Sequence, residues 1–376
     1  MSSNRQGILP DHVIRELIGA GGIRLAAPAA ENQIQPASLD LRLGPIAYRV
    51  RASFLPGPAS TVAEKLERIA LHQFDLGGGA VLETGCVYIA PLLESLELPE
   101  DIAASANPKS STGRLDIFTR VIADRARAFD QAPEGYRGPL YLEISPRTFP
   151  ILVREGTRLS QIRFRRGAAM LDDEALGELH RRERLASGTP RFINGLALSI
   201  DLGGDPDGNP ARDGGGLVGY RAKRYTGLID VDRVAAYDAA DFWEPIRSGA
   251  RPEIVLDPDQ FYILVSGEAV HVPPGYAAEM VPFDPLVGEF RVHYAGFFDP
   301  GFGHEPAGGH GSRAVLEVRS HEIPFILEHG QTIGRLVYEP LAAPPDSLYG
   351  AARGSNYQAQ GLKLSKHFRA AEEVRG

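Results

Sequence analysis

The segment VYIAPLLESLELPEDIAA (87–104) returns in altered form as FYILVSGEAVHVPPGYAA (261–278), at an offset of 174 residues. At the same offset, LYLEISPRTFPILVREG (140–156) returns as AVLEVRSHEIPFILEHG (314–330). Among the identities at this spacing are Tyr88 with Tyr262, Pro99 with Pro273, Glu143 with Glu317, Pro150 with Pro324, and Gly156 with Gly330. A period this long predicts a duplicated globular domain, because solenoid repeats span only about 20 to 50 residues.

The duplication also predicts where the domains begin and end. Upstream, ASLDLRLG (37–44) pairs with LSIDLGG (198–204) at an offset of 161, so insertions separate the two copies. A chain of 376 residues is long enough for two cores of ordinary size. The expected divisions are a first domain, a helical linker, a second domain and a C-terminal tail, over 1–170, 171–192, 193–345 and 346–376 in that order.

The composition is that of an ordinary soluble protein, with 43% hydrophobic and 23% charged residues. No stretch approaches the roughly 18 apolar residues of a membrane span, and the N-terminus lacks the apolar core of a signal peptide, so we expect a cytoplasmic protein. A formal net charge of −8 argues against a generally basic nucleic-acid-binding surface, although it permits a local basic pocket for a phosphorylated small molecule. The single Cys86 excludes intrachain disulfides and multi-cysteine metal sites.

Short apolar or alternating runs bounded by turn residues dominate both halves, and such runs are typical of β-strands. The 42 Gly and 29 Pro make turns frequent and long helices few. Peripheral helices are expected after Asp11 and within 171–186. We therefore predict an all-β fold with a few peripheral helices, in tandem copies; periodicity does not choose between a sandwich, a jelly roll and a distorted barrel.

Glu143 is the first candidate for chemistry. In the strand LYLEIS (140–145) it points to the face opposite Leu142 and Ile144, so it need not be buried in its own domain core. The pattern leaves two interpretations open: a solvated carboxylate on a sheet face, or a general base whose pKa is raised at a domain or subunit seam. Glu317 shows the same alternation, so position alone does not separate the two residues.

The segment NPKSSTGRLDIFTR (107–120) distinguishes the copies. Hydroxyls at Ser110 and Ser111 lie between the cations Lys109 and Arg114, which is a composition suited to gripping a polyphosphate; a polar turn is the alternative. The corresponding VPFDPLVGEFR (281–291) has no paired hydroxyls and carries Asp284 and Glu289, which would repel phosphate. We expect any nucleotide-binding loop to belong to the first copy.

The end of the chain forms a third cluster. SLYGAARGSNYQAQGLKLSKHF (347–368) is rich in Tyr, Gln, Asn and Lys and is punctuated by Gly. This composition suits a lid that closes over a ligand, although a frayed terminus has no less support from the pattern.

These clusters together resemble the dCTP deaminase branch of the dUTPase-like superfamily, whose fold is a distorted all-β barrel of jelly-roll type. Four stretches carry the resemblance, in the family's order: QPASLDLRLG (35–44), KSSTGR (109–114), GYRGPLYLE (135–143) and NYQAQGLKLSK (356–366). The double length is similar to the long, duplicated bacterial form of the enzyme. The resemblance implies hydrolytic deamination of dCTP to dUTP and ammonia in dUTP and dTTP biosynthesis.

The resemblance also implies roles for individual residues. Glu143 would be the general base that activates water, Ser110 and Arg114 would hold that water and polarise the base, and Ala123 would pack near it. The nucleotide-binding set it implies is Lys109, Ser111, Thr112, Gly113, Asp130 at the sugar, Tyr141, Tyr349, Asn356 and Gln360. Lys109 stands where Arg is usual, and Lys363 or Lys366 would compensate for Asn356, which replaces a usual Lys.

One cysteine cannot supply the Pro-Cys-x-x-Cys pair of the zinc-dependent deaminases, so we expect deamination without zinc. Mg²⁺ is expected to arrive with the triphosphate, since it takes oxygen ligands. dCTP and dUTP are the expected ligands, with dTTP as an inhibitor, and the resemblance implies a homo-oligomer with trimer-like packing of barrels and no nucleic-acid or membrane partner.

The second copy keeps Glu317 and the DPGFG turn (299–303) but lacks the Ser and Arg partners, so it is interpreted as degenerate, supplying one wall of the first copy's site. This asymmetry predicts that Glu143→Gln abolishes turnover and Glu317→Gln does not. Three alternatives remain: a dUTP diphosphatase, a bifunctional enzyme that converts dCTP to dUMP, and a non-catalytic nucleotide-binding regulator.

Overall fold

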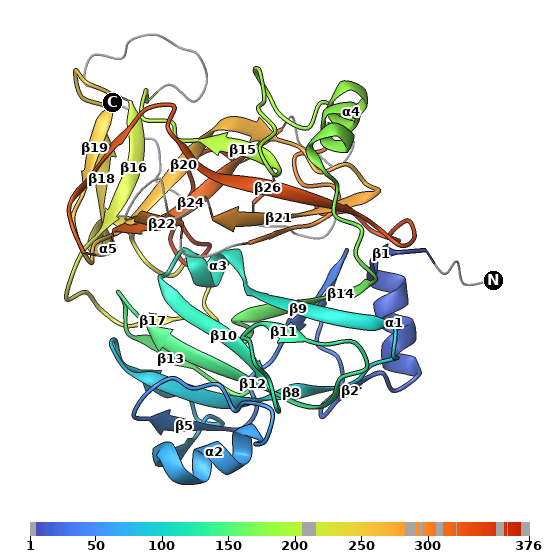
Figure 1. Cartoon of the computed structure of the whole chain (residues 1–376). Coiled ribbons are helices and arrows are strands. Elements are labelled where there is room, and N and C mark those ends of the chain that lie inside the picture. Colours follow the sequence, from blue (N-terminus) through green and yellow to red (C-terminus); the bar gives the residue numbers. More distant parts are fainter. Residues whose placement is uncertain are drawn as a thin grey trace.

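A computed structural model gives the structure of the chain and describes residues 5–204, 216–282, 290–292, 296–305, 311–320, 322–350, 357–358 and 360–369. Two β-domains lie one above the other, the first coloured blue to green and the second yellow-green to red (Figure 1). The short helix α3 (Ser110–Gly113) lies at the boundary between them.

The first domain consists of two main sheets that enclose its core, together with a small third sheet. The first sheet contains, in spatial order, β11 (Gln131–Ala132), β9 (Ile102–Pro108), β14 (Ser160–Arg166), β4 (Ser38–Leu41) and β3 (Ile34–Gln35), with β1 (Gly7–Ile8) on β14. The second contains β10 (Ile117–Ala123), β12 (Arg137–Pro146), β8 (Val87–Glu97), β5 (Ile46–Val50) and β6 (Ala70–Asp75), with β2 (Ile23–Leu25) on β8. The third contains β17 (Ile229–Asp230), β13 (Ile151–Val153) and β7 (Ala80–Leu82).

The second domain repeats this arrangement with its own core. One sheet contains β15 (Leu196–Ser199), β26 (Thr332–Pro340), β21 (Tyr276–Pro282) and β23 (Phe297–Phe298). The other contains β18 (Trp243–Arg247), β16 (Leu217–Ala222), β20 (Phe261–Val270), β24 (Ser312–Ser320) and β22 (Phe290–Val292). β19 (Glu253–Leu256) and β25 (Phe325–Glu328) form a separate pair. The predicted all-β fold in tandem copies is confirmed.

The helices are short and peripheral: α1 (Asp11–Gly19), α2 (Val62–Ile69), α3, α4 (Asp173–Glu183) and α5 (Ala239–Phe242). The expected linker helix is part of the second domain instead. Asp172 caps α4 by accepting a hydrogen bond from the amide of Ala175 at 2.9 Å, and Leu176 and Leu179 are buried in the second core. Burial of this apolar face requires the helix to pack on the domain that follows it.

The strand registers confirm the duplication. β8 pairs with β12 so that Ile89 lies opposite Glu143, and β20 pairs with β24 so that Ile263 lies opposite Glu317, each 174 positions later. The upstream offset of 161 was wrong. The amide of Leu43 donates to the carbonyl of Thr157 at 3.0 Å, and in the second domain the amide of Ile200 donates to Gln331 at 3.0 Å, so this strand repeats after 157 residues.

The two domains share a buried seam. The single tryptophan, Trp243, lies in the first core against Phe149, with ring centroids 5.5 Å apart, although it comes from the second half of the chain. Arg319 of β24 forms a buried ion pair with Asp116 of the first domain. β17 adds a parallel strand to β13, where Arg154 donates to both oxygens of Asp230 at 2.8 and 2.9 Å. Such a seam fixes the relative position of the domains.

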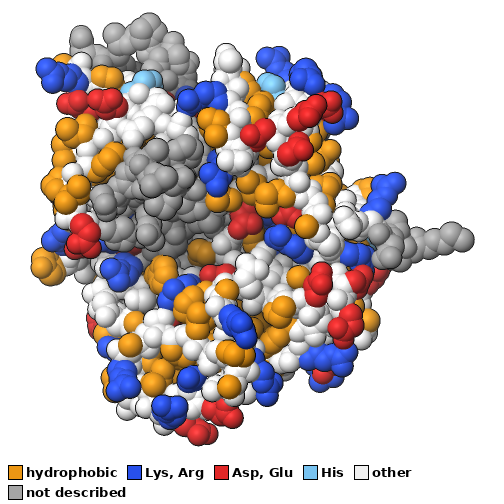
Figure 2. Space-filling view, in the orientation of Figure 1, with side chains coloured by type: hydrophobic (Ala, Val, Ile, Leu, Met, Phe, Trp, Pro, Cys, Tyr) orange, Lys and Arg blue, Asp and Glu red, His pale blue; other side chains and the backbone are white. Residues whose placement is uncertain are grey.

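No helix in the described part of the chain is long and apolar enough to cross a membrane. Figure 2 shows Lys and Arg side chains interspersed with Asp and Glu over the face in view. On this face neither sign of charge predominates.

Candidate active site

The loop singled out in the sequence lies on the seam. β9 ends at Pro108, and Ser110–Gly113 forms the single turn α3. The hydroxyl of Thr112 donates to the carbonyl of Leu159 at 2.8 Å, and the amide of Lys109 donates to the same carbonyl at 3.0 Å. This anchoring buries Thr112 within the first domain and leaves Ser110 and Arg114 facing the second.

A cavity of about 360 Å³ opens between the domains at this loop. Its described lining comes from five parts of the chain: the β3–β4 region, the α3 loop, the segment at the start of β14, the second domain and the C-terminal tail. The lining residues are Asn32, Gln35, Asp40, Pro108, Lys109, Ser110, Ser111, Arg114, Arg158, Gln161, Val231, Asp232, Met280, Gly296, Phe297, Phe298, Asp299, Phe302, Val315, Glu317, Tyr349, Tyr357, Gln360 and Lys366.

The carboxylate beside Arg114 in this cavity belongs to Glu317 of the second domain. Glu317 lies on β24 and is buried, and burial raises its pKa from 4.5 to about 7, although the neighbouring Arg114 opposes that rise. The Nε atom of Arg114 lies 3.8 Å from Oε1 of Glu317, which is an ion pair but too long for a hydrogen bond. A carboxyl with a pKa near neutrality can exchange a proton with a bound water or substrate.

Arg114 is held in place by the tail. Its Nη1 donates to the carbonyl of Lys363 at 2.9 Å, its Nη2 donates to Oε1 of Gln360 at 3.1 Å, and its guanidinium stacks 3.9 Å from the centroid of the Tyr357 ring. The buried Nε has no hydrogen-bond partner among the described residues. Because the other two nitrogens are occupied, the guanidinium has one fixed orientation with Nε free to face a ligand.

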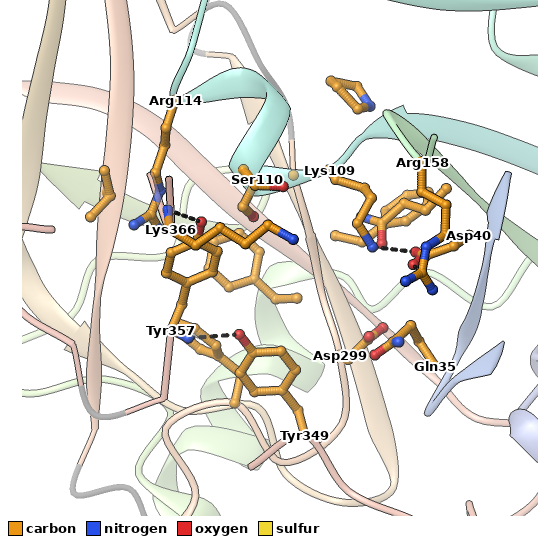
Figure 3. A pocket seen from close by; sticks show the side chains of 18 of the residues that line it. Gln35, Asp40, Lys109, Ser110, Arg114, Arg158, Asp299, Tyr349, Tyr357 and Lys366 are labelled. Carbon is orange, nitrogen blue, oxygen red and sulfur yellow. Dashed lines mark hydrogen bonds and ion pairs between the residues drawn. The ribbon is translucent and has the colours of Figure 1, made fainter. Parts of the chain in front are cut away.

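Cations gather at the other side of the cavity. Lys109 and Arg158 both pair with Asp40, the latter at 3.4 Å, and Lys366 lies between this group and Arg114 (Figure 3). Burial lowers the pKa of Lys366, and the nearby positive charges of Lys109 and Arg158 lower it further. Three cations (Lys109, Arg158 and Lys366) against the two carboxylates of Asp40 and Asp232 leave an excess of positive charge at this end, which suits a polyphosphate.

Asp299 and aromatic rings form a further wall. Burial raises the pKa of Asp299, although Nη2 of Arg163 donates to it at 3.0 Å. Phe302 and Tyr349 pack with ring centroids 5.7 Å apart, and the hydroxyl of Tyr349 accepts from the amide of Tyr357 at 3.2 Å. These flat surfaces and one carboxylate are suited to a sugar and a base.

The structure does not bring Glu143 to Ser110 and Arg114, contrary to our expectation. Glu143 lies on β12 outside the cavity, and its Oε1 accepts from Arg120 of β10 at 2.7 Å. The alternation of the strand was read correctly, but the face that carries Glu143 is turned away from the seam. Glu317, at the equivalent position of the second copy, lies beside Arg114, where Glu143 was expected.

Three more expected residues also lie outside the cavity, because they flank Glu143. Ala123 is buried in the first core, and Tyr141 is buried in a small apolar cluster near α2. Asp130 accepts from the amide of Val121 at 2.7 Å, and burial raises its pKa to about 7. Asp130 does not line the cavity, whereas Asp299 of the DPGFG turn does.

The remaining predicted residues fall into three groups. Lys109, Ser110, Ser111, Arg114, Tyr349 and Gln360 line the cavity together. Thr112 and Gly113 support the loop from within the first domain. Asn356 lies outside the described residues, as do Asp284 and Glu289.

The tail lies against the α3 loop. The hydroxyl of Ser365 donates to the carbonyl of Ser111 at 2.9 Å, and the amide of Lys366 donates to the hydroxyl of Tyr357 at 3.2 Å. Lys366 lines the cavity, whereas Lys363 contributes its carbonyl to Arg114. The described part of 357–369 is thus ordered against the site.

The sequence did not predict that Gln35, Asp40, Arg158, Asp299 and Glu317 would line the cavity. Two signals were available. Gln35 and Asp40 lie in the stretch QPASLDLRLG, and Asp299 opens the DPGFG turn. No local signal marks Arg158, which reaches the cavity from the start of β14.

The donor set does not suit zinc. None of the described lining residues is His or Cys, the usual ligands of a catalytic zinc with carboxylate support. Among the described residues one group has the spacing of metal ligands: Asp11, His12 and Asp346. There Asp11 accepts from the amide of Asp346 at 2.9 Å and from the hydroxyl of Ser347 at 2.7 Å, so it fastens the start of the tail to α1.

Comparison with known proteins identifies the family of this chain. The family model for the N-terminal domain of 2'-deoxycytidine 5'-triphosphate deaminase matches residues 5–168, and the model for its C-terminal domain matches residues 172–368. A crystal structure of 2'-deoxycytidine 5'-triphosphate deaminase from Agrobacterium tumefaciens is 64% identical, with a TM-score of 0.85, and the match covers 89% of this chain and 99% of that one.

Shorter relatives match part of the chain. The dCTP deaminase of Shewanella amazonensis is 30% identical over 167 residues, which cover 42% of this chain and 82% of the relative. A "dCTP deaminase, dUMP-forming" from Coprothermobacter proteolyticus is 30% identical over 158 residues, covering 42% of this chain and 81% of that protein. With both family models matched in order over almost its whole length, the chain belongs to the dCTP deaminase family, in a form that carries an N-terminal and a C-terminal domain.

Proposed function

We propose that this enzyme deaminates dCTP to dUTP and ammonia at the cavity between its domains. One observation carries the proposal: Ser110 and Arg114 of the first domain meet the buried Glu317 of the second in one cavity. A hydroxyl, a fixed guanidinium and a carboxyl with a pKa of about 7 are the groups needed to add water to a ring carbon and expel an amine. The product dUTP would serve the supply of deoxyuridine and thymidine nucleotides.

Glu317 acts as the general base. Its carboxylate takes a proton from water as the oxygen attacks C4 of cytosine, which forms a C–O bond and moves the ring π electrons to N3. The same carboxyl returns the proton to the C4 amino group, and the electron pair on N3 re-forms the C4–N3 double bond as the C–N bond breaks and ammonia leaves. Transfer of the hydroxyl proton from the C4 oxygen to N3 then gives uracil. A pKa near 7 suits both steps, because the group must accept and donate at neutral pH.

Arg114 and Ser110 orient the reactants. The Nε of Arg114, without a partner among the described residues, donates to the water or to the carbonyl of the base, while its other nitrogens stay bound to the tail. Ser110 lies beside Gly296, where an added Cβ would meet its hydroxyl at 3.9 Å, so the position opposite Ser110 is small and leaves room for the base. Deamination then proceeds without zinc.

The cation group binds the triphosphate. Lys109, Arg158 and Lys366 would contact phosphate oxygens, and Asp40 holds the first two in place. The substrate is taken as its Mg²⁺ complex; Asp40 and Asp232 are oxygen donors of the kind that Mg²⁺ accepts at this end of the cavity. Asp299, rather than Asp130, contacts the sugar.

The test is incubation of the full chain with dCTP and Mg²⁺, followed by identification of the products. dUTP with ammonia is the expected result. Glu317→Gln should lower kcat by roughly 10²- to 10⁴-fold, the usual contribution of a general base, while Glu143→Gln should retain substantial turnover. Unchanged dCTP, or a comparable loss in both variants, would refute the proposal.

A second candidate is conversion of dCTP to dUMP. The observation in its favour is that some curated relatives, including the Coprothermobacter proteolyticus protein, are named dUMP-forming. The same incubation separates the candidates, because dUMP is accompanied by pyrophosphate. A dUTP diphosphatase would leave dCTP intact and hydrolyse added dUTP, and a nucleotide-binding regulator would bind dCTP and leave it unchanged.

A further inference from the structure

In the first domain, the guanidinium of Arg42 fills a buried site beside β8. Its Nε donates to Oε1 of Glu94 at 2.8 Å. Its Nη1 and Nη2 donate to the carbonyl oxygens of Pro28 at 2.6 Å and Ala27 at 2.9 Å. The buried carboxylate of Glu94 is therefore neutralised by a cation in direct contact.

The second domain keeps the carboxylate but lacks the cation. Glu268 is the counterpart of Glu94, 174 positions later, and Ser199 is the counterpart of Arg42, 157 positions later. The backbone matches closely: the amide of Arg42 donates to Oε2 of Glu94 at 2.8 Å, and the amide of Ser199 donates to Oε2 of Glu268 at 2.8 Å. The hydroxyl of Ser199 donates to Oε1 of Glu268 at 2.7 Å, and this short side chain carries no charge.

A cavity of about 460 Å³ lies beside Ser199 and Glu268. Segment 187–189 forms one side. It follows Ala186, which bridges to Val270 as Ile23 of β2 pairs with Leu96 in the first domain. Segment 187–189 therefore corresponds to 24–26, and the carbonyls that bind Arg42 in the first domain come from the two residues that follow, Ala27 and Pro28. The described lining residues are Ser187, Gly188, Thr189, Ser199, Asp201, Gly203, Gly267, Glu268, Arg313, His329 and Gly330.

The charges of this cavity leave a net negative site. Arg313 pairs with Asp201, so these two charges offset each other. Nδ1 of His329 accepts from the amide of Leu202 at 3.0 Å, which places the proton of a neutral imidazole on Nε2. Glu268 forms no ion pair with any residue that the structure describes. Among the described residues, Glu268 thus has no cationic partner of the kind that Arg42 provides to Glu94.

We propose that this second-domain cavity binds a small molecule through a guanidinium group, which takes the position that Arg42 fills in the first domain. Glu268 receives one edge of the planar group, in the geometry that Glu94 offers to Arg42. The site shares no described lining residue with the cavity between the domains. The proposal therefore stands independently of the proposed reaction.

The test is isothermal titration calorimetry of the full chain with methylguanidinium, with neutral N-methylurea as the isosteric control. For so small a probe we expect saturable binding with a Kd of about 1 mM and no comparable binding of N-methylurea. Ser199→Arg, which restores the first domain's side chain and fills the cavity, should weaken binding at least about tenfold, and Glu268→Gln should do the same. Glu328→Gln, an exposed carboxylate of the same domain outside the cavity, should leave binding unchanged.

The outcomes are decisive in either direction. Equal binding of the two probes, absence of methylguanidinium binding, or wild-type affinity in Glu268→Gln would each overturn the proposal. If Ser199→Arg fails to fold, Glu268→Gln and Glu328→Gln still decide, since both change only a carboxylate to its amide. Turnover of dCTP should stay within about twofold of wild type in Glu268→Gln, because this residue touches no part of the nucleotide cavity.

Discussion

Replacing Glu317 with Gln should stabilise the folded protein at alkaline pH while it abolishes turnover. Burial raises the pKa of Glu317 from 4.5 to about 7, so between these values the native chain binds a proton that the unfolded chain has released. Stability therefore falls as pH rises through this window. Gln keeps the shape and carries no charge, so the variant escapes this loss.

The size of the effect follows from the shift in pKa. A carboxyl whose pKa moves from 4.5 to about 7 on folding costs of order 3 kcal/mol once both states are ionised. Arg114 already offsets part of the penalty of burial, and this attraction is contained in the shifted pKa. Other carboxyls with raised pKa values, such as Asp130, titrate equally in both proteins and cancel in the difference.

Urea unfolding followed by the fluorescence of Trp243 measures the difference. The side chain is buried in the seam, with Phe261 at a ring-centroid distance of 6.0 Å, so it reports separation of the domains. The variant should match the wild type near about pH 4.5 and exceed it by of order 3 kcal/mol above about pH 8.

The duplicated position provides the matched control. Glu143→Gln should be destabilised throughout this range, because Arg120 loses its carboxylate partner in a largely buried pair. A Glu317→Gln variant with no gain at alkaline pH, or with the same gain at both ends of the range, would refute the assignment of a raised pKa to this residue.

Three further predictions concern the loop, the phosphate end and the seam. Arg114→Lys should lower kcat/KM for dCTP roughly 100-fold in steady-state kinetics, because a single ammonium cannot hold both Lys363 and Gln360 and still face the ligand; near-normal kinetics would contradict this. Lys109→Ala should raise KM about tenfold with little change in kcat, because a phosphate contact made equally in ground and transition states is lost; a selective fall in kcat would place Lys109 at the reacting centre instead. Arg319→Met should cost roughly 3 kcal/mol in urea unfolding, since Asp116 would keep a buried charge, and adding Asp116→Leu should restore much of it; additive losses would argue against a coupled pair.

The sequence predicted the fold more fully than the site. Tyr88, Glu143 and their counterparts at 174 sit in strands whose registers repeat, because alternating burial constrains both copies in the same way. The offset of 161 rested on a few similar letters in a short strand. In that strand the hydrogen bonds of Leu43 and Ile200 show that the correct offset is 157 residues. No local sequence pattern predicts this long-range pairing.

The choice between Glu143 and Glu317 shows the limit most clearly. Both residues occupy the same strand position with the same alternation, so local sequence treats them alike. Their difference arises from the seam, which turns the face of β24 toward α3 and leaves the equivalent face of β12 to Arg120. That orientation depends on contacts between residues more than 200 positions apart, such as Asp116 with Arg319. The periodicity of the sequence does not predict such contacts.

The two copies contribute different residues to the cavity between them. The first domain keeps Lys109, Ser110 and Arg114 and commits Glu143 to an ion pair, while the second keeps Glu317 at the seam. The second domain also carries Ala197 where the first has Asp40, so it has no equivalent carboxylate to gather cations for a triphosphate. A duplicated chain needs each group only once at a shared site, because one domain's loop meets the other's strand across the seam. The copy of each group that faces away from the seam is then free to change, and this explains why both halves look incomplete when read alone.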